Sequence, residues 1–297
     1  MTIGVISDPG QPRSALPEKR EAKSAGERRA RKTVHRMATT PVRSVATIGR
    51  AIVLFADVLR YSVTDTVTMR LPVRELLTQA WTLLTITATP ALLMSIPFGA
   101  MAAVVTSGLV NQVGASSLVG AAGAIAVVRQ GAPITAGLLM GGAAAAAIAS
   151  DFGARAVREE LDAMRVMGVD PVRKLVVPRF LGLLLLSPIL CVYIVVTGTA
   201  ATFVLAVTVS DVTPGSFWMS FGTFAKMVDV WFAMGKTAVF AAIVGIVSSL
   251  RGMEAKGGPR GVADAVNSSV VINVICIMLA NLAITQLQTM FYPTEIA

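Results

Sequence analysis

The feature that most constrains this chain is the length of its uncharged stretches. No Asp, Glu, Lys or Arg occurs from Leu76 to Val128, from Phe180 to Ser210, or from Ala265 to Thr294. Each stretch is at least 30 residues long, whereas a helix needs only about 20 apolar residues to cross the hydrocarbon core of a bilayer. The core of a soluble domain requires no runs of this length. We therefore predict an all-α polytopic membrane protein.

Five membrane-spanning helices are predicted from the apolar segments. The first carries Pro90 and Pro97, and the second is mostly Gly and Ala between Gly137 and Ala149, which lets neighbouring helices approach closely. The predicted spans cover residues 80–107, 123–150, 180–209, 229–250 and 265–291, within a membrane domain over residues 79–297.

Two segments precede this domain. Residues 1–45 combine prolines with a basic cluster and lack apolar periodicity, which is typical of a disordered cytoplasmic tail. The tail either only sets orientation or also attracts anionic lipid. The region 46–78 is expected to hold an amphipathic helix that lies in the membrane interface, or alternatively a short surface helix of a cytoplasmic cap. Its apolar stripe consists of Ile48, Ala51, Ile52, Phe55, Val58 and Leu59.

The net charge of +9 reflects topology rather than a nucleic-acid-binding face. Eleven of the 26 Lys and Arg residues lie in residues 1–50. Six more lie in the loop 151–179 and three in the loop 251–263, while the connection 108–122 has none. Because basic residues accumulate on the cytoplasmic side of a membrane, we predict an inner (plasma) membrane protein with a cytoplasmic N-terminus and an extracytoplasmic C-terminus.

Catalytic and metal sites are not expected. The only histidine, His35, lies in the basic tail, and Cys191 and Cys276 lie inside apolar runs. Gly235-Lys236-Thr237 looks like the end of a nucleotide-binding P-loop, but the glycine required five residues before Gly235 is Val230. Any ATP energy must therefore come from a partner protein, and no cofactor is predicted for this chain.

The loop after the second predicted span has the pattern of an amphipathic helix. Val157, Leu161 and Met164 fall on one face at helical spacing, and a second face is charged. Gly168 and Pro171 are expected to end the helix. Such a helix either docks in a groove of another protein or lies on the membrane as a solvated connector. The charged face consists of Arg155, Glu159, Asp162 and Arg165.

Two basic residues, Arg129 and Lys236, lie within or beside predicted spans. Ionisable groups at such positions usually line a cavity and mark function. We predict that they meet an anionic lipid headgroup, with snorkelling to the outer interface as the alternative.

Two segments carry a resemblance to a known family. The stretch GARAVREELDAMRVMGVDPVRKLVVPR, from Gly153 to Arg179, resembles the signature loop of the MlaE/YrbE permeases of ABC-type lipid transporters. The run GGPRGVADAVNSSVV, from Gly257 to Val271, resembles the A-type YrbE subunit of actinobacterial Mce systems. The resemblance implies an interfacial helix, five spans and a cytoplasmic coupling helix between spans 2 and 3. The implied coupling residues are Arg155, Arg158, Glu159, Glu160, Asp162, Arg165, Gly168 and Asp170.

The same resemblance implies a transporter permease subunit rather than an enzyme. Its partners would be a second YrbE-like permease, a cytoplasmic ABC ATPase dimer that binds ATP and magnesium, and MCE-domain proteins that hand over a fatty acid, sterol or phospholipid for import. Two alternatives are an ion-coupled secondary transporter and a non-transporting assembly or anchor subunit. A secondary transporter usually carries acidic residues within its spans, whereas Asp229 and Asp264 lie at predicted span ends.

Overall fold

The computed structural model describes residues 47, 49–64, 73–112 and 118–291. The expected basic tail, residues 1–45, lies outside them. The chain divides into two compact units, residues 1–52 and 53–297. In the first unit, the described residues are helical. In the second, the described segments are helices and the turns that join them, without a strand among them.

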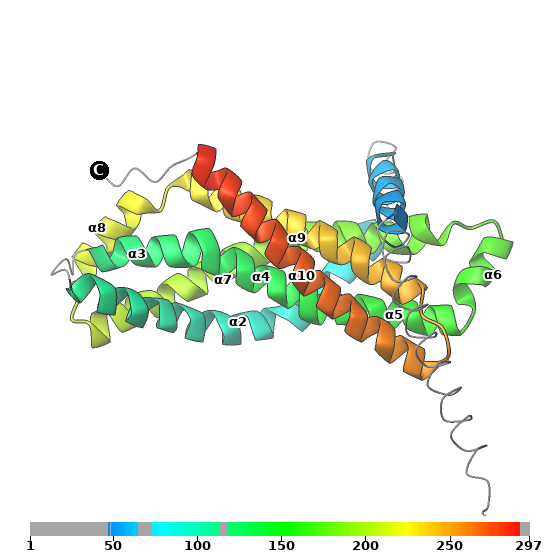
Figure 1. The fold of residues 1–297 in the computed structure, drawn as a ribbon, viewed down its shortest axis with the longest axis horizontal. Coiled ribbons are helices and arrows are strands. Elements are labelled where there is room, and N and C mark those ends of the chain that lie inside the picture. The colour runs from blue at the N-terminus through cyan, green and yellow to red at the C-terminus, as the bar shows by residue number, and fades with distance from the viewer. Residues whose placement is uncertain (1–46, 48, 65–72, 113–117, 292–297) are drawn as a thin grey trace, which may run out of the picture. The chain divides into compact units, whose positions relative to one another are not determined.

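Five helices among the described residues are long and apolar enough to cross a membrane, as the sequence predicts. The first is α2 (Val73–Gln112), and the third joins the short π-helix η4 (Val172–Val176) to α7 (Val177–Val209). The fourth is α9 (Met227–Met253) and the fifth is α10 (Pro259–Phe291) (Figure 1). Helices α7 and α10 end at the predicted residues, Val209 and Phe291, whereas the helices begin before the predicted starts.

The second span alternates α-helical and π-helical segments. Pro133 has no N–H and cannot donate the usual helical hydrogen bond to the carbonyl of Arg129, and the α-helical pattern is interrupted just before it. The small side chains of the second span allow α7, α9 and α10 to pack against it. The segments are α3 (Val119–Ala124), η2 (Ile125–Gly131), α4 (Ala132–Leu139), η3 (Met140–Ala144) and α5 (Ala145–Val157).

Helices α2 and α7 lie side by side (Figure 1). A Cβ atom on Gly99 would collide with the carbonyl oxygen of Gly198, so the two backbones could not approach this closely with a larger residue. Thr202 Oγ1 donates to the carbonyl of Gly99 at 3.0 Å, and the hydroxyls of Ser95 and Thr197 lie 2.7 Å apart. Hydroxyl contacts of this kind join helices where no water is present.

The structure corrects the helix predicted in the loop after the second span. Helix α5 continues to Val157, and a separate short helix, α6 (Glu160–Val166), follows it. Glu159 between them has φ 60° and ψ 15°, a left-handed conformation that interrupts a right-handed helix. The predicted charged face is therefore divided between two helices. The predicted end is confirmed, since α6 stops just before Gly168, which has φ 76°.

Two further helices complete the fold. Helix α8 (Pro214–Phe224) joins α7 to α9 and packs on α3 through Phe217, in a small apolar cluster with Val119 and Ala206. Residues 53–64, within the expected interfacial helix, are helical. Val58 of the predicted stripe is buried, whereas Phe55 and Leu59 are exposed. This exposed apolar face suits a membrane surface, and the interfacial position stays a prediction.

Candidate functional site

A buried ion pair joins the second and fourth spans. Arg129, on the π-helical segment η2, has its Nε 2.8 Å from Oδ1 of Asp229, and its Nη2 donates to Oδ2 at 3.1 Å. Asp229 lies in the first turn of α9, where the helix dipole favours a negative charge. Its carboxylate also accepts from Gln288 Nε2 of α10 at 3.2 Å and from the backbone N–H of Lys226 at 3.3 Å. Three segments far apart in sequence therefore meet at one carboxylate.

Lys236 lies two helical turns after Asp229 and is 1% exposed. Its Nζ donates to the carbonyl of Arg129 at 3.2 Å and to Thr285 Oγ1 at 3.1 Å. The first acceptor is the carbonyl to which Pro133 cannot donate. Lys236 is thus held inside the bundle rather than snorkelling to an interface.

The structure brings together the two predicted lipid-pocket residues, Arg129 and Lys236. Two cations and one carboxylate leave this cluster with a formal charge of +1, and the two acceptors of Lys236 are neutral. Sequence reasoning missed Asp229, although its spacing of seven residues from Lys236 places both on one face of α9. The side chain of Arg129 is 19% exposed, so it is the more accessible cation of the cluster. A role of the cluster in lipid binding stays a prediction.

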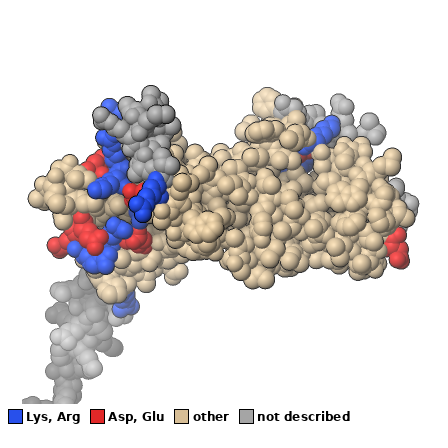
Figure 2. All heavy atoms as spheres, turned by 180° about the vertical axis from the view of Figure 1, so that it is seen from behind, with Lys and Arg blue, Asp and Glu red and all other residues tan. Residues whose placement is uncertain are grey.

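The predicted coupling residues lie on and around α6, at the end where charged side chains gather over the surface (Figures 1 and 2). Arg158 Nε lies 3.0 Å from Glu160 Oε1, and Arg165 Nη1 lies 2.9 Å from Asp162 Oδ1. The exposed side of α6 also carries apolar side chains, with Val166 89% exposed. An exposed helix that mixes ion pairs and bare apolar side chains is suited to a protein partner.

Asp170 is held by hydrogen bonds to other residues of the chain. Asp170 Oδ1 accepts from the N–H of Val172 at 2.9 Å, which fixes the start of η4. The hydroxyl of Tyr61 hydrogen-bonds to the same carboxylate, and this bond, together with the negative charge, raises the pKa of Tyr61. Arg173 lies over the Tyr61 ring at 5.9 Å from its centroid. Asp170 therefore ties the loop to the helical residues 53–64.

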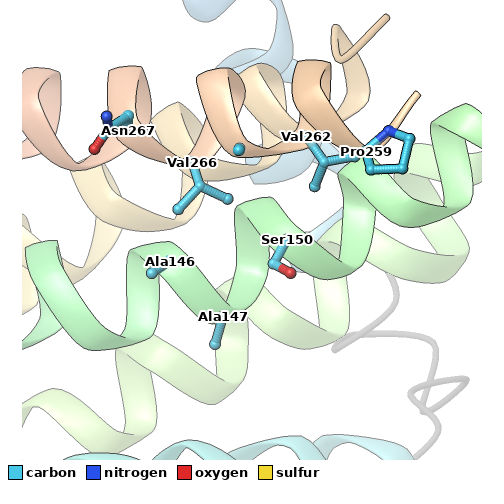
Figure 3. Close-up of a pocket in the computed structure, with 8 residues that line it drawn as sticks. Ala146, Ala147, Ser150, Pro259, Val262, Val266 and Asn267 are labelled. Carbon is cyan, nitrogen blue, oxygen red and sulfur yellow. The ribbon is translucent and has the colours of Figure 1, made fainter. Parts of the chain in front are cut away.

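A shallow groove lies between α5 and the first part of α10 (Figure 3). Apart from Ser150 and Asn267 its lining is apolar, so it suits an apolar chain or helix rather than a charged group. Neither Arg129 nor Lys236 lines it. The remaining lining residues are Ala146, Ala147, Pro259, Val262, Ala263 and Val266.

The five apolar helices, four of which pack against the second span with its small residues, define an all-α polytopic membrane protein. Residues 76–287 match the family model described as Permease MlaE, and the chain belongs to this permease family. The predicted resemblance is therefore confirmed for the family, whereas the A-type subgroup stays a prediction.

Three curated relatives are similar to the chain. It is 29% identical over 168 residues to a probable ABC transporter permease protein of Synechocystis sp., covering 57% of this chain and 64% of that protein. It is 28% identical over 175 residues to the chloroplastic protein TRIGALACTOSYLDIACYLGLYCEROL 1 of Arabidopsis thaliana, covering 59% and 50%. It is 29% identical over 163 residues to a probable ABC transporter permease protein of Rickettsia conorii, covering 55% and 63%. The chain spans between half and just under two thirds of the length of these relatives.

Proposed function

We propose that this protein is the membrane-spanning permease subunit of an ABC transporter that moves a lipid. The observation that carries the proposal is α6, a short exposed helix with charged and apolar side chains, placed between two membrane spans. Two of the similar proteins are named as probable ABC transporter permeases. A permease without its own nucleotide-binding motif requires a helix of this kind to receive an ATPase.

The proposed complex holds this chain, a second YrbE-like permease, a cytoplasmic ABC ATPase dimer and extracytoplasmic MCE proteins. The distribution of basic residues supports a cytoplasmic position for α6. The long apolar spans support a multi-pass position in a membrane, which we propose to be the inner (plasma) membrane. In this arrangement ATP and magnesium bind to the ATPase, and the permease contributes the lipid path.

The proposed substrate is a fatty acid, sterol or phospholipid, imported after MCE proteins deliver it. The +1 cluster of Arg129, Lys236 and Asp229 favours a lipid with a carboxylate or phosphate headgroup, since the spare cation attracts an anion. Lys236 is buried and Arg129 partly exposed, so a headgroup meets Arg129 first. Contact with Lys236 requires the helices to separate.

The test is to purify the chain together with the ATPase, the second permease and the MCE proteins, and to reconstitute the complex in liposomes. We expect the ATPase to co-purify and labelled lipid to move only with hydrolysable ATP. A complex without an ATPase would contradict the proposal and favour an assembly or anchor subunit. Transport driven by an ion gradient in the absence of ATP would favour a secondary transporter.

Lys236→Met tests the headgroup site within that complex. The variant keeps the side-chain length and removes the charge, so we expect normal assembly and weakened transport of an anionic lipid. Lys236→Arg should keep part of the activity because the charge is retained. Equal transport of anionic lipid by the parent and by Lys236→Met would exclude the headgroup role.

A further inference from the structure

Arg179, at the base of the α6 loop, is buried against other residues of the chain. Its side chain is only 7% exposed, and its Nη2 pairs with Oδ2 of Asp151 on α5. Its Nη1 donates to the carbonyl of Leu175 at 3.3 Å, and its guanidinium lies 4.5 Å from the centroid of the Phe152 ring. A side chain held by a carboxylate, a carbonyl and an aromatic ring is not available to a partner protein. Its role therefore lies inside the loop.

Asp151 connects this arginine to α6. Its second oxygen, Oδ1, accepts from Arg155 Nε at 3.2 Å, and Arg155 Nη1 lies 3.8 Å from Glu160 Oε2. Glu160 is the first residue of α6. A continuous path of charged side chains thus runs from α7, through α5, to α6.

The backbone does not provide such a path, because it changes direction at both ends of α6. Glu159 and Gly168 have φ values of 60° and 76°, and Leu161 is the buried residue of α6. Helical hydrogen bonds therefore do not run without a break from α6 into either span. A displacement of α6 reaches α5 and α7 chiefly through the side chains at its base.

We propose that Asp151 and Arg179 are positioning residues that convert a displacement of α6 into a movement of α5 against α7. The proposal rests on the function proposed above, since it requires an ATPase seated on α6. Neither residue belongs to the exposed side of α6, so removing either charge should leave the ATPase bound. Hydrolysis and lipid movement should then become uncoupled.

The experiment compares the reconstituted parent complex with Asp151→Asn, Arg179→Met and Arg179→Lys. The control is Glu254→Gln, which removes a carboxylate 3.9 Å from Arg251 at the end of α9, outside the α6 loop. Three quantities are measured for each complex: the amount of co-purified ATPase, the rate of ATP hydrolysis, and the lipid moved per ATP hydrolysed.

For Asp151→Asn and Arg179→Met we expect ATPase binding and hydrolysis within about twofold of the parent, because the docking surface is intact. We expect the lipid moved per ATP to fall by about tenfold, which lies within the range that mutations along a coupling network produce. Arg179→Lys keeps the positive charge but loses the planar guanidinium group. Its amount of lipid moved per ATP should therefore lie between those of Arg179→Met and the parent. Glu254→Gln should match the parent.

Two results would overturn the proposal. One is a parent-like amount of lipid per ATP in either charge-removing variant. The other is loss of the ATPase in both of them, which would make the pair an ordinary element of folding. Failure of the proposed function is distinguishable, because it would appear in the parent complex as absent ATPase or absent ATP-dependent transport.

Discussion

The Arg129–Asp229 pair allows a quantitative prediction for Asp229→Asn. The substitution keeps the size of the side chain, but Gln288 donates to Oδ1 and the N–H of Lys226 to Oδ2, so the single oxygen of asparagine can keep only one of these two bonds. The substitution also removes the negative charge that Arg129 contacts at 2.8 Å and 3.1 Å. Arg129 would then be a largely buried cation without its carboxylate.

The expected cost follows from the burial of the two partners. Removing one partner of a buried ion pair typically costs about 3–5 kcal/mol. The side chain of Asp229 is 6% exposed and that of Arg129 is 19% exposed, so water partly solvates the remaining cation and the lower end applies. A loss of about 3 kcal/mol, at about 2–4 °C per kcal/mol, lowers the melting temperature by roughly 6–12 °C.

The assay heats the purified chain in detergent with a thiol-reactive fluorescent dye. Cys191 is buried on α7, so its reaction with the dye reports unfolding once the partly exposed Cys276 is replaced by Ser in every variant. Asp264→Asn is the matched control, since Asp264 is an exposed acid on α10. A melting temperature of Asp229→Asn within about 1 °C of the parent would refute the reasoning.

A double-mutant cycle separates the pair from its surroundings. Arg129→Gln removes the cation, and the double variant removes both charges of the pair while Lys236 keeps its two neutral acceptors. We expect the double variant to be more stable than the sum of the single effects predicts, by about 0.5–3 kcal/mol. Strict additivity would show that the two charges do not interact in the folded protein.

Three further predictions follow from the proposed function and from the loop. The chain purified alone should hydrolyse no ATP, as measured by phosphate release, and hydrolysis that survives removal of contaminating ATPases would contradict the permease assignment. Reversing Glu160 and Asp162 to Lys should lower co-purification of the ATPase or uncouple hydrolysis from transport, because interfacial charges set the register of docking; parent-like yield and transport would argue against docking on α6. Tyr61→Phe removes the hydrogen bond to Asp170 while keeping the ring under Arg173, so the loop should exchange amide hydrogens faster around Asp170; unchanged exchange would show that the bond does not hold the loop.

The sequence by itself determined the class of protein and its five spans. Uncharged apolar runs as long as Leu76 to Val128 are typical of membrane helices, which need about 20 apolar residues and satisfy every backbone polar group within one segment. Gly168 was likewise readable as the end of the loop helix, since its backbone occupies a conformation that glycine adopts easily. The left-handed conformation of Glu159 was not readable, because its neighbours Arg158, Glu160 and Leu161 all have good helix propensity.

Only the tertiary structure decided which charged groups meet. Asp229 lies 100 residues from Arg129, and Arg179 lies 28 residues from Asp151, distances over which a helical pattern carries no information. The position of Lys236 shows the same limit. Its place near the start of α9 allows either snorkelling or burial, and burial prevails because the carbonyl that Pro133 leaves without its helical donor lies on a neighbouring helix within reach of the amine. The local sequence determines which residues can lie in a membrane helix, and the packing of the helices determines which charged side chains contact one another.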